Sequence, residues 1–456
     1  MNEIRNILTA QKQFFQSGCT RDIDFRLEML NRLKNGIIKN ETRILDALNK
    51  DLSKSAYESY LTEVGVVRDE IRLAIRRLKS WARPRRVKTP FYLWFASSRT
   101  YCEPYGRALI IAPWNYPFLL SISPLIGSIA AGNCSVLKPS EYAPHTSAVI
   151  SGIIENHFDR EVVAVIEGDA HIGDALLKER FDYIFFTGAV NVGRIVMSAA
   201  AKYLTPITLE LGGKSPCIVD KDVDMDLAAR RIVFGKYLNA GQTCIAPDYL
   251  LVHQSNKAKL LDHIQKYINK FYGRNPRKSP DYARIINRRH FTRLAALLEE
   301  GDIIIGGQSD PDDLYIAPTV IEKITWESSI MQDEIFGPIL PVLEFDDLSD
   351  VVSILNSRPK PLALYVFSKR PTSCRQVIDQ VSFGAGCIND TLVQFANPHL
   401  PFGGVGNSGM GRYHGKASFE TFSHEKSILK KWFNFEPPLR YPPYKNKLSI
   451  LKKILR

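Results

Sequence analysis

The sequence lacks the features that would place the protein in a membrane or outside the cell. It has 456 residues, and no stretch reaches the roughly 18 consecutive apolar residues that a transmembrane helix needs. The nearest candidate, 119–131, is interrupted by three serines and a proline. Residues 1–13 alternate polar and apolar side chains and lack the apolar centre of a signal peptide. These absences predict a cytoplasmic protein.

Patterns that bind metals or form disulfides are missing as well. The seven cysteines, at 19, 102, 134, 217, 244, 374 and 387, are scattered and form no CxxC pair. An odd number in this arrangement argues against a disulfide framework and against a zinc site. The nine histidines are dispersed without ligand spacing, so no metal is predicted. There is also no P-loop, zinc-protease, serine-hydrolase or EF-hand motif.

Charge is distributed unevenly along the chain. The net charge is +12, but residues 72–88 alone carry eight basic and no acidic side chains, and 426–456 carry nine basic and one acidic. The remainder is slightly acidic, as in an ordinary enzyme. The stretch 72–88 interleaves Leu73, Ile75 and Leu78 like a surface helix, and no nucleic-acid-binding motif accompanies it. We therefore expect no nucleic-acid partner.

The order of apolar runs predicts an α/β protein with more than one domain. A single core stops growing near about 250–300 residues, so this length predicts two or three domains. Residues 1–80 show helical spacing of apolar side chains, and residues 92–104 look extended. From residue 107 on, short apolar strands alternate with helices, which is typical of a doubly wound parallel sheet. Strands are expected near 108–112, 134–138, 161–166, 183–186, 216–219, 249–252 and 363–367, and helices near 118–131, 144–156, 171–177, 191–202, 224–238 and 256–270.

One cysteine has neighbours that suit a nucleophile. Cys244 ends the segment Gly241-Gln242-Thr243-Cys244, which follows a helical pattern. A tight turn opened by glycine exposes the sulfur and lets backbone N–H groups converge on it. Such groups stabilise both a thiolate and an oxyanion. On its own, this tetrapeptide more often contains a packed, unreactive thiol. Whether Cys244 is a nucleophile therefore depends on the other motifs.

Two further motifs carry polar side chains beside strands. Glu210 lies between two leucines and before two glycines, and an acid in apolar surroundings has a raised pKa that suits a general base near neutral pH. A solvated glutamate at a strand edge is the alternative. Asn115, in Pro113-Trp114-Asn115-Tyr116-Pro117, follows a predicted strand. Its amide can donate to an oxyanion or can serve the turn alone.

Two strand ends resemble places where a nucleotide binds. Thr187, Gly188 and Gly193 lie between a strand and a helix, which suits a pyrophosphate at a helix N-terminus, although the GxGxxG motif is absent. Lys138 and Glu141 follow another strand, where ribose hydroxyls would lie. Each signal is weak alone.

Taken together and in order, these segments resemble the aldehyde dehydrogenase superfamily, over 105–430 strongly and over the rest more loosely. The matching motifs are Pro113-Trp114-Asn115, Leu137-Lys138-Pro139-Ser140-Glu141, Phe186-Thr187-Gly188, Leu209-Glu210-Leu211-Gly212-Gly213-Lys214, Gly241-Gln242-Thr243-Cys244, Glu334-Ile335-Phe336-Gly337-Pro338 and Pro401-Phe402-Gly403-Gly404. Within the superfamily the chain is similar to the class 3 branch, which includes fatty and aromatic aldehyde dehydrogenases.

The resemblance implies an aldehyde dehydrogenase-like α/β fold with two doubly wound parallel-sheet domains and a small oligomerisation region. Residues 1–85 and 105–210 would form the NAD(P)-binding domain. Residues 211–420 would form the catalytic domain. Residues 86–104 and 421–456 would bridge a homodimer and carry the basic C-terminal tail.

The resemblance also implies a mechanism for oxidising medium- or long-chain aliphatic, or aromatic, aldehydes to carboxylic acids. Cys244 would attack the carbonyl, with the Asn115 amide and the Cys244 N–H holding the oxyanion. Hydride transfer to the cofactor would leave a thioester, which water deprotonated by Glu210 would hydrolyse. Asn389 matches a position near that water. An acylating dehydrogenase, which passes the thioester to a thiol, is the alternative, but such relatives generally lack the glutamate.

For the cofactor, the resemblance assigns Lys138 and Glu141 to the adenosine ribose and Thr187, Gly188 and Gly193 to the region of the pyrophosphate. It also counts Leu211 among the cofactor-binding residues. It assigns Glu334 and Phe336 to the nicotinamide ribose. A carboxylate at Glu141 repels a 2′-phosphate, whereas Lys138 attracts one. NAD is therefore favoured, and NADP stays open.

The basic C-terminal tail leaves two interpretations open. Leu448, Leu451 and Leu455 share a helical stripe, while the basic side chains lie mostly elsewhere. Such a tail can bind an anionic membrane weakly. It can also pack on the partner subunit, and this second interpretation is favoured.

Overall fold

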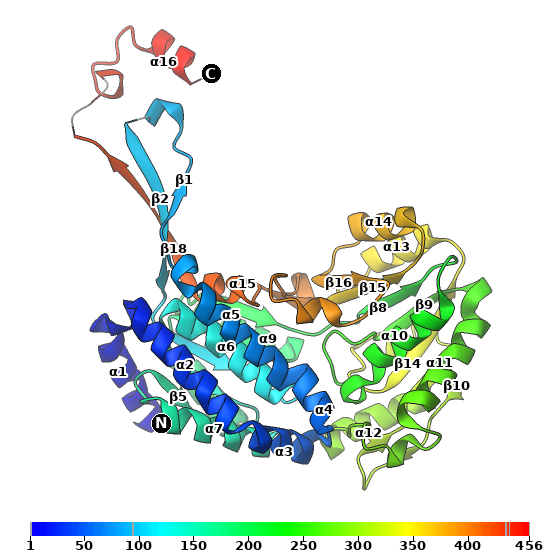
Figure 1. Cartoon of the computed structure of the whole chain (residues 1–456). Coiled ribbons are helices and arrows are strands. Elements are labelled where there is room, and N and C mark those ends of the chain that lie inside the picture. Colours follow the sequence, from blue (N-terminus) through cyan, green and yellow to red (C-terminus); the bar gives the residue numbers. More distant parts are fainter. Residues whose placement is uncertain (1, 94, 434–435, 437, 456) are drawn as a thin grey trace.

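The computed structural model of the chain describes residues 2–93, 95–433, 436 and 438–455. It consists of two α/β units and a projecting arm (Figure 1). Trp94, Pro437 and Arg456, which fall in segments discussed above, lie outside the described residues.

The chain begins with helices that cover the first sheet. Leu30, Leu33, Ile37, Ile44 and Leu48 repeat at helical spacing and are completely buried, so the burial of one face stabilises these helices. The helices are α1 (Asn2–Gln16), α2 (Ile23–Lys39), α3 (Glu41–Leu52), α4 (Ala56–Ser59) and α5 (Gly65–Trp81), with a π-helical turn, η2 (Tyr60–Val64), between the last two. The prediction of helices over 1–80 is confirmed.

The first sheet has six strands in the order β17-β7-β6-β3-β4-β5. Its parallel strands are β3 (Arg107–Ile111), β4 (Cys134–Lys138), β5 (Val163–Val165), β6 (Tyr183–Thr187) and β7 (Ile207–Glu210). The connecting helices are α6 (Pro117–Ala131), α7 (Pro144–His157), α8 (Ala170–Leu177) and α9 (Val190–Ala201). Every residue of α6 is buried, which explains its almost uniformly apolar sequence.

The second sheet has seven strands in the order β10-β13-β14-β9-β8-β15-β16. These are β8 (Pro216–Val219), β9 (Tyr249–His253), β10 (Asp302–Ile305), β13 (Thr319–Glu322), β14 (Ile339–Phe345), β15 (Ala363–Phe367) and β16 (Ala385–Ile388). All pairs are parallel except β10 with β13. The helices are α10 (Met225–Tyr237), α11 (Lys257–Tyr272), α12 (Arg288–Ala296), α13 (Leu348–Asn356) and α14 (Pro371–Gln380), and a small ladder joins β11 (Ser309–Asp310) to β12 (Tyr315–Ile316).

Segments from two distant parts of the chain form the arm. β1 (Arg85–Val87) and β18 (Ser423–Lys431) both pair antiparallel with β2 (Ala96–Pro104), and Figure 1 shows this ribbon projecting from the body, with α16 (Leu448–Ile454) at its far end. α15 (Lys416–Thr421) leads into β18. Ile428, Leu429 and Trp432 remain largely exposed on the arm.

The predicted fold class is confirmed, and one strand departs from the predicted division of the chain. β17 (Gly409–Met410) falls within 211–420 but pairs antiparallel with β7 of the first sheet. Its pairing brings the glycine-rich segment across to Glu210. Among the described residues, no helix combines the length and apolar character that crossing a membrane requires. In the same part of the chain, no three His, Cys, Asp or Glu side chains gather as metal ligands.

Candidate active site

Two cavities meet at Cys244. The larger one, of about 710 Å³, lies between the two sheets and contains polar and charged groups. The smaller one, of about 180 Å³, has almost entirely apolar walls. Their shared wall consists of Leu120, Thr187, Glu210, Leu211 and Cys244. A group bound to the Cys244 sulfur would therefore face both cavities.

The turn before Cys244 is unusual. Asn239 and Ala240, in the short helical turn η4 (Leu238–Gly241), both adopt left-handed φ angles, 53° and 51°. Gly241 is also left-handed, and a β-carbon there would overlap the carbonyl of Gly337. Gln242 then bonds the main chain on both sides, donating to Asn239 O at 3.1 Å and to Arg284 O at 2.9 Å. The nucleophile candidate is thus presented by a fixed turn rather than by a flexible loop.

The Cys244 thiol is half-buried and faces opposing electrostatic effects. Burial, followed by the negative charges of Glu334 and Glu210, raises its pKa. The backbone N–H groups of Cys244 and Ile245 act in the opposite direction. The convergence of N–H groups on this sulfur, expected from the sequence, is therefore present. The thiol still requires a positive charge nearby to become a thiolate at neutral pH.

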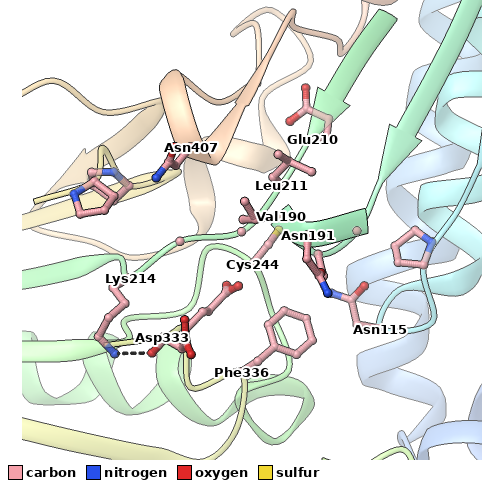
Figure 2. Close-up of a pocket in the computed structure, with 18 of the residues that line it drawn as sticks. Asn115, Val190, Asn191, Glu210, Leu211, Lys214, Cys244, Asp333, Phe336 and Asn407 are labelled. Carbon is pink, nitrogen blue, oxygen red and sulfur yellow. Dashed lines mark hydrogen bonds between the residues drawn. The ribbon is translucent and has the colours of Figure 1, made fainter. Parts of the chain in front are cut away.

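Asn115 lies beside this turn, in the loop after β3. It is buried, lines the larger cavity, and donates from Nδ2 to Gln242 O at 3.1 Å. Next to it, the Tyr116 hydroxyl and Thr243 Oγ1 are 2.7 Å apart. The Asn115 and Cys244 segments are therefore joined directly, although they are far apart in the sequence. Figure 2 shows both side chains in one pocket.

Glu210 ends β7 and is buried at the junction of the cavities. Neither carboxylate oxygen has a hydrogen-bond partner among the described residues. Burial without a partner raises its pKa well above the usual range of a glutamate. Figure 2 shows the carboxylate turned away from the Cys244 sulfur. A rotation about its side-chain bonds would be needed to bring it toward a water near the sulfur.

The strand β6 and the helix α9 form one wall of the larger cavity. Thr187, Gly188 and Leu211 line it, together with the first residues of α9. Gly193 packs on Leu211, where a β-carbon would come within 2.7 Å of a leucine methyl. The glycines therefore let a helix N-terminus face an open space, which suits a pyrophosphate. Lys138 and Glu141, at the carboxyl end of β4, form an ion pair of 3.1 Å.

The opposite wall carries Glu334 and Phe336. Glu334 is pressed against Gly212, where a β-carbon would overlap its carboxylate, and it faces the backbone N–H of Gly213. Burial, with a smaller effect of Asp248, raises the Glu334 pKa to about 8. Phe336 meets Trp114 edge to face at 5.4 Å between ring centroids. Lys214 donates to the Asp333 carbonyl at 2.9 Å, the dashed line of Figure 2, and steadies this wall.

Asn389 is bonded within its own loop rather than facing either cavity. It follows β16 and lines neither cavity. Its side chain binds the main chain of Ser368 on both sides, with Nδ2 donating to the carbonyl at 3.0 Å and Oδ1 accepting from the N–H at 2.8 Å. Its carbonyl accepts from Arg231. All its polar groups serve the loop, so a role at the catalytic water is not supported.

Sequence reasoning missed several residues of the larger cavity. Arg194, His290, Arg293 and Asn407 line it. Arg194 directly follows Gly193 and could have been found from that position. Burial lowers the pKa of His290 to about 4, with Arg293 and Arg289 contributing, so its ring is neutral at physiological pH. Nothing local marks His290 or Asn407, since their place depends on how distant segments come together.

Comparisons with known proteins identify the family of this chain. The family model described as "Aldehyde dehydrogenase family" matches residues 2–428. The 4,4'-diaponeurosporen-aldehyde dehydrogenase of Staphylococcus aureus is 49% identical, with all of both chains covered. Aldehyde dehydrogenase family 3 member B1 of Homo sapiens is 46% identical over 97% of this chain and 95% of its own. A solved structure, "Substrate bound state of Staphylococcus Aureus AldH", has a TM-score of 0.98 at 48% identity, with complete coverage of both chains.

The fold and the cysteine site thus define an oxidoreductase of the NAD(P)-dependent aldehyde-oxidising class. The chain belongs to the aldehyde dehydrogenase family, and its relatives place it on the class 3 branch. Its reaction is the oxidation of aldehydes to carboxylic acids.

Proposed function

We propose that the enzyme oxidises extended apolar aldehydes, with Cys244 as nucleophile, Asn115 and the Cys244 N–H as oxyanion donors, and Glu210 as the base. The single observation that carries this proposal is the position of Cys244 and Glu210 in the shared wall of the two cavities. Attack by the thiolate on the carbonyl carbon forms a tetrahedral adduct, whose oxyanion the two N–H donors stabilise. Loss of hydride leaves a thioester, and water that has lost a proton to Glu210 hydrolyses it.

The larger cavity would hold NAD. The N-terminus of α9 with Thr187, Gly188 and Gly193 suits the pyrophosphate, Leu211 the adjoining wall, and the Glu334 carboxylate and Phe336 the nicotinamide ribose. Lys138 and Glu141 would meet the adenosine ribose. Bound NAD⁺ supplies the hydride acceptor and a cationic ring, whose charge favours the thiolate form of a nearby cysteine. One structural neighbour, at 27% identity, is described as an NAD-dependent aldehyde dehydrogenase from Sinorhizobium meliloti.

The smaller cavity would hold the substrate chain. Its walls come from η2, α5, α6 and the 392–402 segment, and they offer an aldehyde tail almost no hydrogen-bonding groups. Such a lining favours aliphatic, aromatic or polyene chains over charged or sugar aldehydes. The name of the Staphylococcus aureus relative, which refers to a diaponeurosporen aldehyde, supports this class.

The test follows NADH formation with hexanal, decanal and benzaldehyde, for the wild type and for Cys244→Ala. We expect turnover with the apolar aldehydes and none in the variant. A charged aldehyde such as glyoxylate serves as the control and should react poorly. Full activity of Cys244→Ala, or no activity of the wild type with any of the three, would overturn the assignment.

The arm would join two subunits in a homodimer. Its exposed apolar side chains, among them Ile428, Leu429 and Phe433, would be covered by a second copy. Leu448, Leu451 and Leu455 of the tail are exposed as well, and would pack on the partner or bind weakly to an anionic membrane from the cytoplasm. Light scattering of the chain and of a version ending at Pro443, with flotation of both on anionic vesicles, separates these outcomes. A monomeric full chain contradicts the dimer, and equal flotation of both contradicts membrane contact.

A further inference from the structure

The N-terminal helices contain a buried carboxylate that touches the turn before the nucleophile. Glu58, in α4, is buried, and its Oε1 accepts from the Asn239 N–H at 2.8 Å. We infer that Glu58 is a positioning residue, which holds the left-handed turn at Asn239 and thereby fixes Asn115 and Cys244 relative to each other. This inference rests on the roles proposed above for Asn115 and Cys244.

The contact continues from the turn to both candidate catalytic groups. Asn239 Nδ2 donates to Asn115 O at 2.8 Å and to Gln242 O at 3.2 Å. Gln242 O also accepts from Asn115 Nδ2 at 3.1 Å. Asn239 therefore links the oxyanion loop to the segment that ends in Cys244, two residues beyond Gln242. The orientation of Asn239 itself depends on the Glu58 bond to its N–H.

The turn at Asn239 has a strained backbone, so the hydrogen bond from its N–H to Glu58 is important for its conformation. Two consecutive residues with side chains, Asn239 and Ala240, adopt left-handed angles. Such residues persist only where their surroundings hold them. If the Glu58 carboxylate is removed, the Asn239 N–H is left buried without an acceptor. The turn would then relax toward ordinary angles, and Cys244 would move with it.

A second buried contact from the same segment holds the neighbouring loop. Lys54 and Glu63 form an ion pair of 2.6 Å with no exposed side-chain surface. Glu63 Oε2 accepts from Phe118 N at 3.0 Å and Leu119 N at 3.1 Å, at the start of α6 and directly after the Asn115 loop. The π-helical turn η2 lies between Glu58 and most of α5, and such turns are frequent near functional sites. Glu63 anchors a whole helix, so Glu58, which binds only the turn, is the better residue to test.

The surroundings of Glu58 indicate that its acceptor oxygen matters more than its charge. Burial raises its pKa to about 7, against the opposing effects of Lys54 and the Asn239 N–H, while Glu63 and Asp281 add to the rise. Tyr116 and Tyr272 also lie within its electrostatic reach. A glutamine retains the acceptor and removes the charge. A leucine retains the volume and removes the acceptor.

The experiment compares Glu58→Leu and Glu58→Gln in the full-length enzyme. Three quantities are measured: kcat and KM for NAD with decanal, the rate at which iodoacetamide alkylates Cys244, and the melting temperature. We expect Glu58→Leu to lower kcat by about 10- to 100-fold, the range of a misplacement near 1 Å, and to change the alkylation rate several-fold. KM for NAD should stay within about twofold, and Glu58→Gln should restore kcat to within about threefold of the wild type.

Asp51 provides a matched control. This carboxylate also belongs to the N-terminal helices, is 1% exposed, and accepts from His145 N at 3.1 Å and Thr146 N at 2.8 Å at the start of α7. Asp51→Leu should lower the melting temperature as Glu58→Leu does, but leave kcat and Cys244 alkylation unchanged. If Glu58→Leu does not fold, Glu58→Asp carries the same test, since one fewer methylene withdraws the oxygen from Asn239.

Wild-type kcat and alkylation in Glu58→Leu would overturn the inference. The inference would also be overturned if Glu58→Gln failed to restore kcat, or if Asp51→Leu lowered kcat as Glu58→Leu does. The proposed function fails separately, through an active Cys244→Ala enzyme. An inactive Cys244→Ala with an unaffected Glu58→Leu would reject only the positioning role.

Discussion

The two cavities share one wall but are built in different ways. The larger, polar cavity is lined partly by elements that follow one another in the chain, from the end of β6 through the start of α9 to the end of β7. More distant segments, such as Glu334–Phe336 and His290, complete it. The smaller, apolar cavity collects side chains from 61–66, 116–120, 234–245 and 392–413. Strand ends line much of the polar cavity, whereas helix faces and late loops line the apolar cavity.

Because the two cavities differ in polarity, residues of the shared wall face two different environments. On one side, N–H groups and charged side chains favour an anionic ligand. On the other, the walls exclude water and favour an apolar chain. Glu210 lies between these environments, and its carboxylate has no hydrogen-bond partner in the part of the chain that the structure describes, so we expect its protonation to respond to bound ligands. We therefore expect a substitution in one cavity to change the KM of only the ligand proposed for that cavity. A substitution in the shared wall should affect both ligands.

The largest expected effect is that of Glu210→Gln, in the shared wall. Without the base, the thioester should form but hydrolyse slowly. Steady-state turnover should fall by about 10²- to 10⁴-fold, while a first-turnover burst of NADH remains. Stopped-flow measurement with decanal checks both phases. Loss of the burst would show that Glu210 acts before hydrolysis.

Part of the polar cavity could be predicted from the sequence because the signals of that part are local. Thr187 and Gly188 lie within a strand–glycine–helix pattern, and Glu210 ends a strand before two glycines, so short-range backbone geometry determines their positions. The predicted strands β3, β4, β6, β8, β9 and β15 are all present, with small differences at their ends. These strands can be predicted directly from short runs of apolar residues.

The apolar half could not be predicted, since tertiary packing brings it together. Val66 and Phe395 line one cavity, although more than 300 residues separate them. Likewise, no pattern links Glu58 to Asn239, or Gly409 to Glu210. The position predicted for Asn389 rests on resemblance alone, and in the structure its amide bonds to the main chain of Ser368.

A matched pair of substitutions tests whether the cavities are independent. Val66→Asp places a charge in the apolar cavity, and Val190→Asp places one at the start of α9 in the polar cavity. The first should raise KM for decanal about tenfold or more with little change for NAD, because the chain would contact a carboxylate. The second should raise KM for NAD by repelling the pyrophosphate, with little change for decanal. If both variants affect both ligands equally, the division into two cavities is wrong.

A smaller effect is expected at the carboxyl end of β4. Glu141→Gln removes the charge that repels a 2′-phosphate and frees Lys138 from its ion pair. The ratio of kcat/KM for NADP to that for NAD should rise about tenfold, equivalent to roughly 1.4 kcal/mol. Glu155→Gln, at an exposed position of α7, is the control and should leave the ratio unchanged. An unchanged ratio in Glu141→Gln would place the adenosine ribose elsewhere.

The smallest effect concerns stability and the protonation of the shared wall. The folded protein raises the pKa of Glu210 above its unfolded value, so the native state binds this proton more tightly. Stability must then fall as the pH rises from the unfolded pKa toward the folded one. Glu210→Gln imitates the protonated acid and escapes this loss. Its melting temperature should match that of the wild type near about pH 5 and exceed it by about 1–3 °C near about pH 9. An equal difference at both pH values would mean that folding does not raise the pKa of Glu210 above its unfolded value. Since no described residue bonds to the buried carboxylate, that result would also remove the physical basis for treating Glu210 as a base.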